Sequence, residues 1–155
     1  MGLDMHLSKK TYVKKWSHQK KEQQHTVSVK VGGKARKDIK LKRISHIVEE
    51  VMYWRKSNSI HSWFVQNCQD GNDNCGEHYV SIEQLQELAS LCEEVVKTKN
   101  TSLLETQGGF FFGSTDYDEY YFDDCKRTAK ELRKLLKEKT PEGCYGGDFY
   151  YQSSW

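Results

Sequence analysis

The helical stripe that begins at Ser81 most constrains what this chain can fold into. Ser81 and Gln84 fit a capping box, and the apolar residues that follow recur every three or four positions. These residues are Leu85, Leu88, Leu91, Cys92, Val95 and Val96. The stripe predicts an amphipathic helix that ends near residues 99–100 and buries one face against other elements.

A second helical stripe runs from Tyr121 to Leu135. Asp116 and Glu119 fit a capping box before it, and Lys and Arg residues gather toward its C-terminal end, as the helix dipole favours. Pro141 follows and predicts the end of this helix.

A third helical pattern covers residues 39–67, where apolar side chains again recur at three- and four-residue spacing. It predicts one bent helix or two abutting helices, because residues 57–59 are Ser, Asn and Ser, which compete with the helical backbone. In such a helix Trp54, Asn58 and His61 share one face.

Alternating apolar residues predict strands near both ends of the chain. Residues 3–7 and 25–31 alternate with a period of two, and a Gly32–Gly33 turn follows the second segment. Residues 148–155 carry aromatic side chains on both faces and predict a final strand. The three phenylalanines at 110–112 lie between glycines and predict a short central strand.

Strands at the ends and in the middle, with three helical blocks between them, favour an α+β fold over a doubly wound α/β fold. We expect a small antiparallel or mixed sheet with about three helices packed on one face. The 155 residues fit a single domain, residues 1–155. Within it we expect a basic hairpin or loop region at about residues 14–43.

Charge is distributed unevenly along the chain. Residues 1–43 carry 13 Lys and Arg against 3 Asp and Glu, whereas the rest carries 11 against 19. The two parts therefore attract each other, or one of them meets a charged partner.

Three further features indicate the compartment. No run of 18 apolar residues predicts a membrane span, and residues 1–10 lack the apolar core of a signal peptide. The five cysteines contain no C-x-x-C pair and fit reduced thiols in a cytoplasmic protein.

A ligand-binding surface is the first candidate site. Trp54, Asn58 and His61 on one helix face can stack on a flat ligand such as a nucleobase, or can be buried and satisfied by their neighbours. The arginine next to Trp54 can bind a phosphate or pair with the acidic residues at 116–124. The full candidate set is Trp54, Arg55, Asn58, His61, Tyr117 and Asp118.

The basic N-terminal region is the second candidate site. Lysines and arginines near aromatic residues can bind backbone phosphates and stack bases. The alternative is a solvated face that protects a sheet edge. The candidate residues are Lys14, Lys15, Trp16, Lys20, Lys21, Lys34, Arg36 and Lys37.

No catalytic set stands out, and we predict neither a metal nor a cofactor. The carboxylates at 116–124 fit helix capping better than a Mg²⁺ site. Cys68, Cys75 and His78 lack a recognised zinc spacing. The loop at 70–81 lacks the central Gly and the final Glu of an EF-hand.

Four blocks of the sequence resemble a functionally uncharacterised family of small phage and prophage proteins. They are the G-L-D-M start, W-R-K-S-N-S-I-H-S-W-F-V, G-G-F-F-F-G-S-T-D-Y-D-E-Y-Y, and the final D-F-Y-Y-Q-S-S-W. The resemblance covers the first dozen residues and most of 44–155, and it implies a viral accessory protein in the host bacterial cytoplasm. Residues 14–43 fit the family least well, which suggests a lineage-specific addition that sets partner choice.

These observations favour a non-enzymatic binding protein. We expect it to act in phage takeover or counter-defence by blocking a host protein or a nucleoprotein complex, for example as an anti-CRISPR protein. One alternative is a protein that binds or sequesters a nucleotide ligand. Another is direct nucleic-acid binding through the basic N-terminal region.

Overall fold

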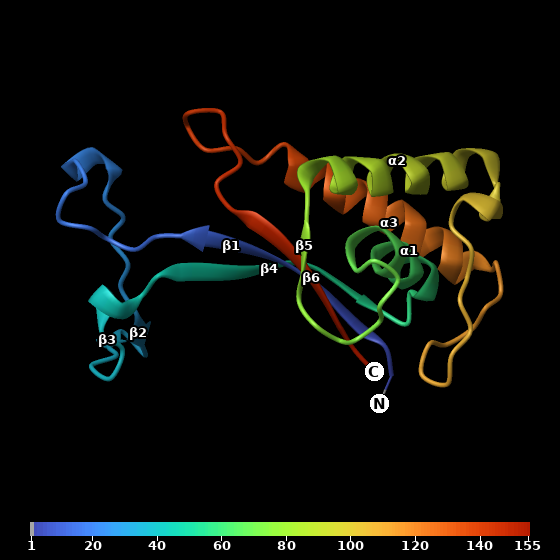
Figure 1. Cartoon of the computed structure of the whole chain (residues 1–155), viewed down its shortest axis with the longest axis horizontal. Helices are drawn as coiled ribbons and strands as arrows, with labels where there is room; N and C mark the ends of the chain where they lie inside the picture. The colour runs from blue at the N-terminus through green and yellow to red at the C-terminus, as the bar shows by residue number, and fades with distance from the viewer. Residues whose placement is uncertain (1) are drawn as a thin grey trace.

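The computed structural model describes residues 2–155 and confirms the α+β class (Figure 1). A four-stranded sheet carries three α-helices, and a separate two-stranded hairpin projects from it. The strands are β1 (Asp4–Tyr12), β2 (Lys30–Val31), β3 (Lys34–Ala35), β4 (His46–Arg55), β5 (His78–Val80) and β6 (Asp148–Ser154). The helices are α1 (Asn58–Cys68), α2 (Ile82–Thr98) and α3 (Glu119–Leu136), with 3-10 turns η1 (Lys21–Gln23), η2 (Leu41–Arg43) and η3 (Thr101–Leu103).

The main sheet is antiparallel, in the order β4-β1-β6-β5. The predicted alternation in β1 is confirmed, since Leu3, Met5 and Leu7 are fully buried. The predicted last strand is confirmed as β6, which pairs with β1 on one side and β5 on the other. β5 was not expected from the sequence.

The helix predicted over residues 39–67 is wrong for its first half. Residues 46–55 form β4, which pairs with β1, and the helix α1 begins only at Asn58. Lys56 adopts φ 55° between the two elements and turns the chain. Apolar residues such as Val51 and Met52 fit both periods, so the pairing with β1 decided in favour of the strand.

The other two helices agree with the sequence prediction. Ser81 and Gln84 form the expected capping box of α2, which ends at Lys99 in the left-handed conformation. The cap of α3 differs from the prediction, because Asp118 rather than Asp116 is the N-cap. The core between helices and sheet is centred on fully buried large side chains, namely Trp54, Tyr151, Phe64, Leu85, Leu88 and Leu132.

The central strand predicted at 110–112 is wrong. These residues form a turn in a long loop from 104 to 118, with Phe110 95% exposed and Phe112 buried. The backbone N–H of Phe112 bonds the carbonyl of Gly109, and Gly113 adopts φ 84°. A residue with positive φ interrupts a strand, so Gly113 serves the turn.

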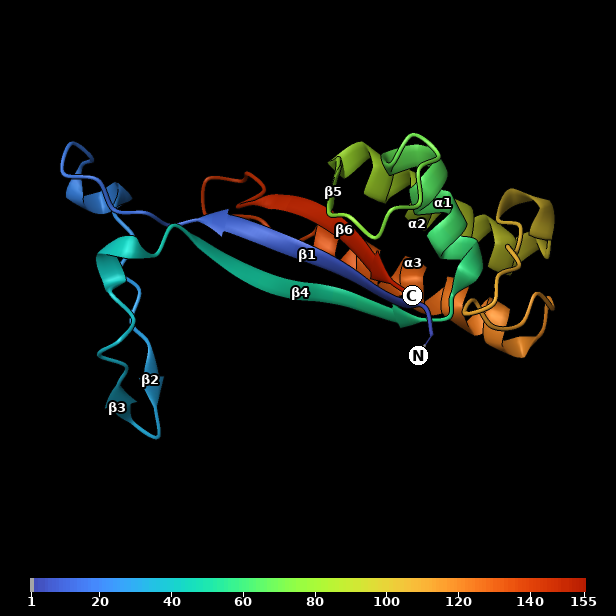
Figure 2. The ribbon, with the colours of Figure 1, turned by 60° about the horizontal axis from the view of Figure 1, so that its bottom comes forward.

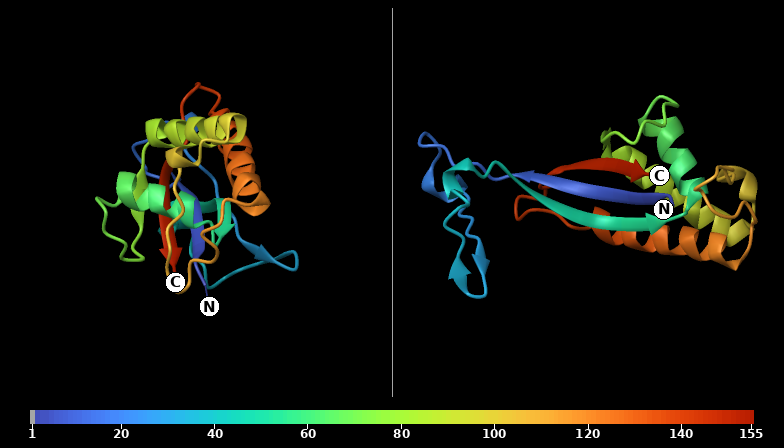
Figure 3. Two further views of the ribbon diagram at one scale, coloured as in Figure 1. Left: turned by 90° about the vertical axis from the view of Figure 1, so that its right-hand side faces the viewer. Right: turned by 90° about the horizontal axis from the view of Figure 1, so that it is seen from below.

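Residues 13–45 form an arm at the far end of the β1–β4 strand pair, away from the helices (Figures 2 and 3). The strand predicted at 25–31 is largely wrong, because only Lys30–Val31 pairs, with Lys34–Ala35 across the expected Gly32–Gly33 turn. Within this range Val13 is the one buried residue. The arm therefore has no core of its own.

Candidate functional site: a charged pocket and a basic arm

The structure does not bring the predicted aromatic ligand face together. Trp54 lies on β4 and His61 on α1, and both side chains are completely buried. The Trp54 indole N–H donates to Thr128 Oγ1 at 2.7 Å. This hydrogen bond links α3 to the sheet, and the buried Trp54 ring is not available to a ligand.

His61 is satisfied on both sides of its ring. Nδ1 lies 2.7 Å from the Tyr151 hydroxyl, and Nε2 lies 2.8 Å from Asp73 Oδ2. An Nε2–H that donates to Asp73 leaves Nδ1 to accept from Tyr151, whose pKa is raised by burial so that its hydroxyl stays protonated. His61 thus joins α1, β6 and the loop before β5.

Asn58, in the first turn of α1, anchors the loop at 104–118. Its Nδ2 donates to the carbonyls of Phe112 and Ser114 at 3.0 and 2.8 Å. Its Oδ1 accepts from the backbone N–H of Gln107 at 3.0 Å. These contacts position the loop beside the start of α1, although the residues are about 50 positions apart.

A pocket of about 370 Å³ opens where this loop meets α1 and α3. Of the six predicted ligand residues, Arg55, Asn58 and Asp118 line it, whereas Trp54, His61 and Tyr117 do not. The Tyr117 hydroxyl instead accepts from the Thr106 backbone N–H at 3.3 Å. The remaining lining includes Lys56, Ser57, Ser59, Ser114, Asp116, Tyr120, Asp123 and Asp124.

Opposite charges line this pocket without neutralising each other. No ion pair among the described residues joins Arg55 or Lys56 to the carboxylates of the facing wall. Burial raises the pKa of Asp124, and the Ser57 hydroxyl approaches that carboxylate without a well-formed hydrogen bond. Ser57 is also the N-cap of α1, yet its side chain caps nothing.

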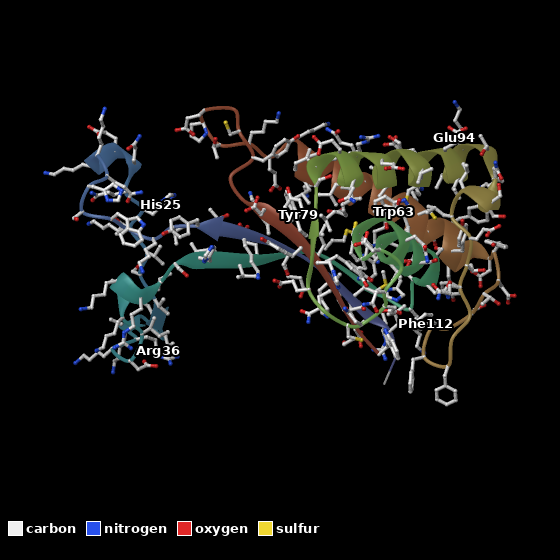
Figure 4. The ribbon with its side chains drawn as sticks, in the orientation of Figure 1. His25, Arg36, Trp63, Tyr79, Glu94 and Phe112 are labelled. Atoms are coloured by element: carbon white, nitrogen blue, oxygen red, sulfur yellow. The ribbon has the colours of Figure 1, made fainter. Side chains whose placement is uncertain are left out.

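The basic arm holds all eight residues of the second candidate set. Lys14 is half-buried with its Nζ 4.8 Å above the Trp16 ring, and the other seven side chains are exposed. Arg36 pairs with Asp38 through two hydrogen bonds. Figure 4 shows the arm's side chains, among them His25 and Arg36, spreading away from the body.

The sequence analysis missed the uncovered face of the sheet. Strand alternation sends Tyr53, Tyr79 and Tyr150 to the side opposite the helices. The sequence signal for this face was the set of alternate residues in β1 and β6 that point away from the helices. The face was missed because β4 was predicted as a helix and β5 was not predicted at all.

No group of three or more His, Cys, Asp or Glu among residues 2–155 is placed to hold a metal ion. All five cysteines are free thiols, and burial raises the pKa of Cys68 to about 12. No helix in the described chain is both long and apolar enough to cross a membrane. Comparison with known proteins found no matching family model, curated protein or solved structure.

Proposed function

We propose that this protein is a non-catalytic binding protein that uses its basic arm to hold a nucleic acid, either free or within a host nucleoprotein complex. The arm is the observation that carries the proposal. Residues 14–43 hold 11 Lys and Arg against 2 Asp and Glu. Such a charge density favours binding to a phosphate backbone.

The lack of a core in the arm supports this role. Its residues are exposed or half-buried apart from Val13, so packing does not explain their composition. A surface that is only solvated needs charged side chains but no excess of one sign, because like charges repel one another. A polyanionic partner would relieve that repulsion on binding.

The resemblance to phage and prophage proteins suggests where the protein acts. We propose a viral accessory protein in the host bacterial cytoplasm, with a host nucleoprotein complex such as a CRISPR effector as its target. The body would then make additional contacts that select the complex.

The test measures binding of fluorescent 20-nucleotide and 20-base-pair DNA across a salt series. We expect the logarithm of the association constant to fall linearly with the logarithm of salt concentration, by about 0.9 per neutralised duplex phosphate. Changing Lys20, Lys21, Lys34 and Lys37 to Glu should remove most of the affinity and lower this slope.

The matched control carries the same charge change on the helices, at Lys97, Lys126, Lys130 and Lys134. It should retain most of the affinity. Equal loss in both variants, or no binding at low ionic strength, would contradict the proposal. Nuclease treatment of a host-lysate capture should release the partner if nucleic acid mediates the contact.

A second candidate function is binding of a nucleotide-like ligand in the pocket at the start of α1. The observation that favours it is the unpaired Arg55 and Lys56 beside an uncapped helix N-terminus, since anions bind such sites.

A magnesium–nucleotide panel should raise the melting temperature of the protein, and Arg55→Ala should abolish the shift. Arg127 does not line the pocket, so Arg127→Ala should preserve the shift in melting temperature. A panel without any shift would eliminate this candidate.

A further inference from the structure

The uncovered face of the main sheet presents aromatic rings in register across its four strands. On β1, His6 lies beside Tyr53 of β4 and Gln152 of β6. One step further along, Ser8 lies beside Tyr150 of β6, which in turn lies beside Tyr79 of β5. Two aromatic pairs therefore lie toward opposite edges of one sheet face.

The rings within each pair touch and keep much of their surface exposed. The centroids of His6 and Tyr53 are 5.2 Å apart, and those of Tyr79 and Tyr150 are 5.9 Å apart. Tyr79 is 55% exposed and Tyr53 38%. Tyrosines that serve the core bury their rings, as Tyr151 does between them on the other face. Packing within the chain therefore does not account for this surface.

Most carboxylates on this face are already engaged by neighbouring side chains. Glu50 lies 3.0 Å from His6 Nδ1, and Asp4 accepts from the Tyr53 hydroxyl. Glu77 pairs with Lys10, whose Nζ also lies 4.7 Å above the Tyr150 ring. Of these contacts, the ion pair between Glu77 and Lys10 offsets one negative charge that an incoming polyanion would meet.

The same face continues into the basic arm. β1 carries His6, Lys10 and Tyr12 toward the arm, and six residues of strand span about 20 Å. Tyr12 is 47% exposed, contacts His46 edge-on and accepts a hydrogen bond from the Trp16 indole N–H at 2.8 Å. Rings and cations thus form one path from the sheet to the arm.

We propose that this open sheet face stacks the unpaired bases of a single-stranded nucleic acid whose backbone the arm holds. The inference rests on the proposed function and specifies it. A sheet face with exposed aromatic rings suits bases that are splayed out of a helix, whereas a duplex hides the faces of its bases. The lysines of the arm supply the attraction for phosphates that the face itself lacks. The protein should therefore favour single strands.

The experiment compares the affinity of the full chain for a fluorescent 20-nucleotide oligothymidine and for a 20-base-pair duplex. We expect the double variant Tyr53→Ala with Tyr79→Ala to lose on the order of tenfold in single-strand affinity. Its duplex affinity should stay within twofold of the wild type. The double variant Tyr53→Phe with Tyr79→Phe keeps the rings and should bind single strands as the wild type does.

The matched control is Phe110→Ala, because this phenylalanine is 95% exposed in the loop at 104–118 and lies outside both the face and the pocket. It should leave both affinities unchanged. Unfolding curves of all variants establish that they are folded. Equal affinity of the wild type and the alanine variant for single strands would overturn the inference while leaving the proposed function standing. So would equal losses of affinity for both DNA forms. Absence of any binding by the wild type would overturn both.

Discussion

At the scale of single residues, polar side chains that suggest a ligand contact are used to hold the fold together. Asn58 satisfies three backbone groups of the loop at 104–118, and His61 joins Asp73 to Tyr151. Both side chains are buried, and a buried polar group without a partner is costly. Their hydrogen bonds therefore account for these residues without a ligand.

Asn58→Ala should destabilise the protein by about 2–3 kcal/mol, because it leaves one N–H and two carbonyls of the loop without their partner. For a chain of this size this corresponds to a melting temperature lower by about 5–10 °C in calorimetry. Asn67→Ala, which removes one bond within α1, is the control and should cost less than about 1 kcal/mol. Equal costs would show that Asn58 does not anchor the loop.

Asp124→Asn should change how stability depends on pH. Burial raises the pKa of Asp124, so the folded state binds a proton more tightly than the unfolded state does. Stability from this group is present at low pH and is lost as pH rises through the folded pKa. The variant should melt at a higher temperature than the wild type at pH 7 and at a similar temperature at pH 3. A lower melting temperature at pH 7 would reverse the assigned sign.

At the scale of elements, short-range signals placed the starts of α2 and α3 to within a turn but did not distinguish between neighbouring carboxylates. Asp118 Oδ1 accepts from the Tyr121 N–H at 3.1 Å, which makes Asp118 the cap of α3. Asp116 lies two residues earlier in the loop. Both fit the sequence pattern of an acidic residue before a helix.

Asp118→Ala should lower the free energy of unfolding by about 1 kcal/mol, as expected for loss of an N-cap. Asp116→Ala is the matched control and should change it by less than about 0.5 kcal/mol, as expected for an exposed side chain. Urea unfolding followed by circular dichroism measures both. A larger loss from Asp116→Ala would return the cap to the position that the sequence suggested.

At the scale of the whole molecule, the stabilising core and the concentration of basic residues lie in different parts of the chain. The core lies between the main sheet and the three helices, and the arm projects beyond it (Figure 1). The arm leaves and re-enters the body at one place, where the Val13 N–H donates to the Ser45 carbonyl at 2.8 Å. This geometry makes the arm a long insertion between two paired strands.

Replacing residues 14–44 by an Asn-Gly turn should leave the body folded, because Val13 and Ser45 already lie opposite each other as in a hairpin. We expect the melting temperature to change by less than about 5 °C, since a core that is left intact keeps its stability. Binding to DNA should be lost. An unfolded product would show that the arm contributes to the stability of the body.

The sequence by itself determined the α+β class, the helices α2 and α3, the strands β1 and β6, and the division of charge. These features depend on local information, namely capping residues, apolar periodicity and composition. The apolar residues within 46–55 fit the period of a helix as well as that of a strand. The glycines around Phe110–Phe112 fit a strand boundary as well as a turn.

Tertiary structure alone decided the identity of β4, the turn at 110–112, and the grouping of Arg55, Asn58 and Asp118 around one pocket. The physical reason is that each depends on partners distant in the chain. β4 is a strand because β1 offers its hydrogen bonds across the 33 residues, 13–45, that separate the two strands. The loop lies beside α1 because the Asn58 amide bonds its backbone. The uncovered aromatic face likewise exists only once four strands pair.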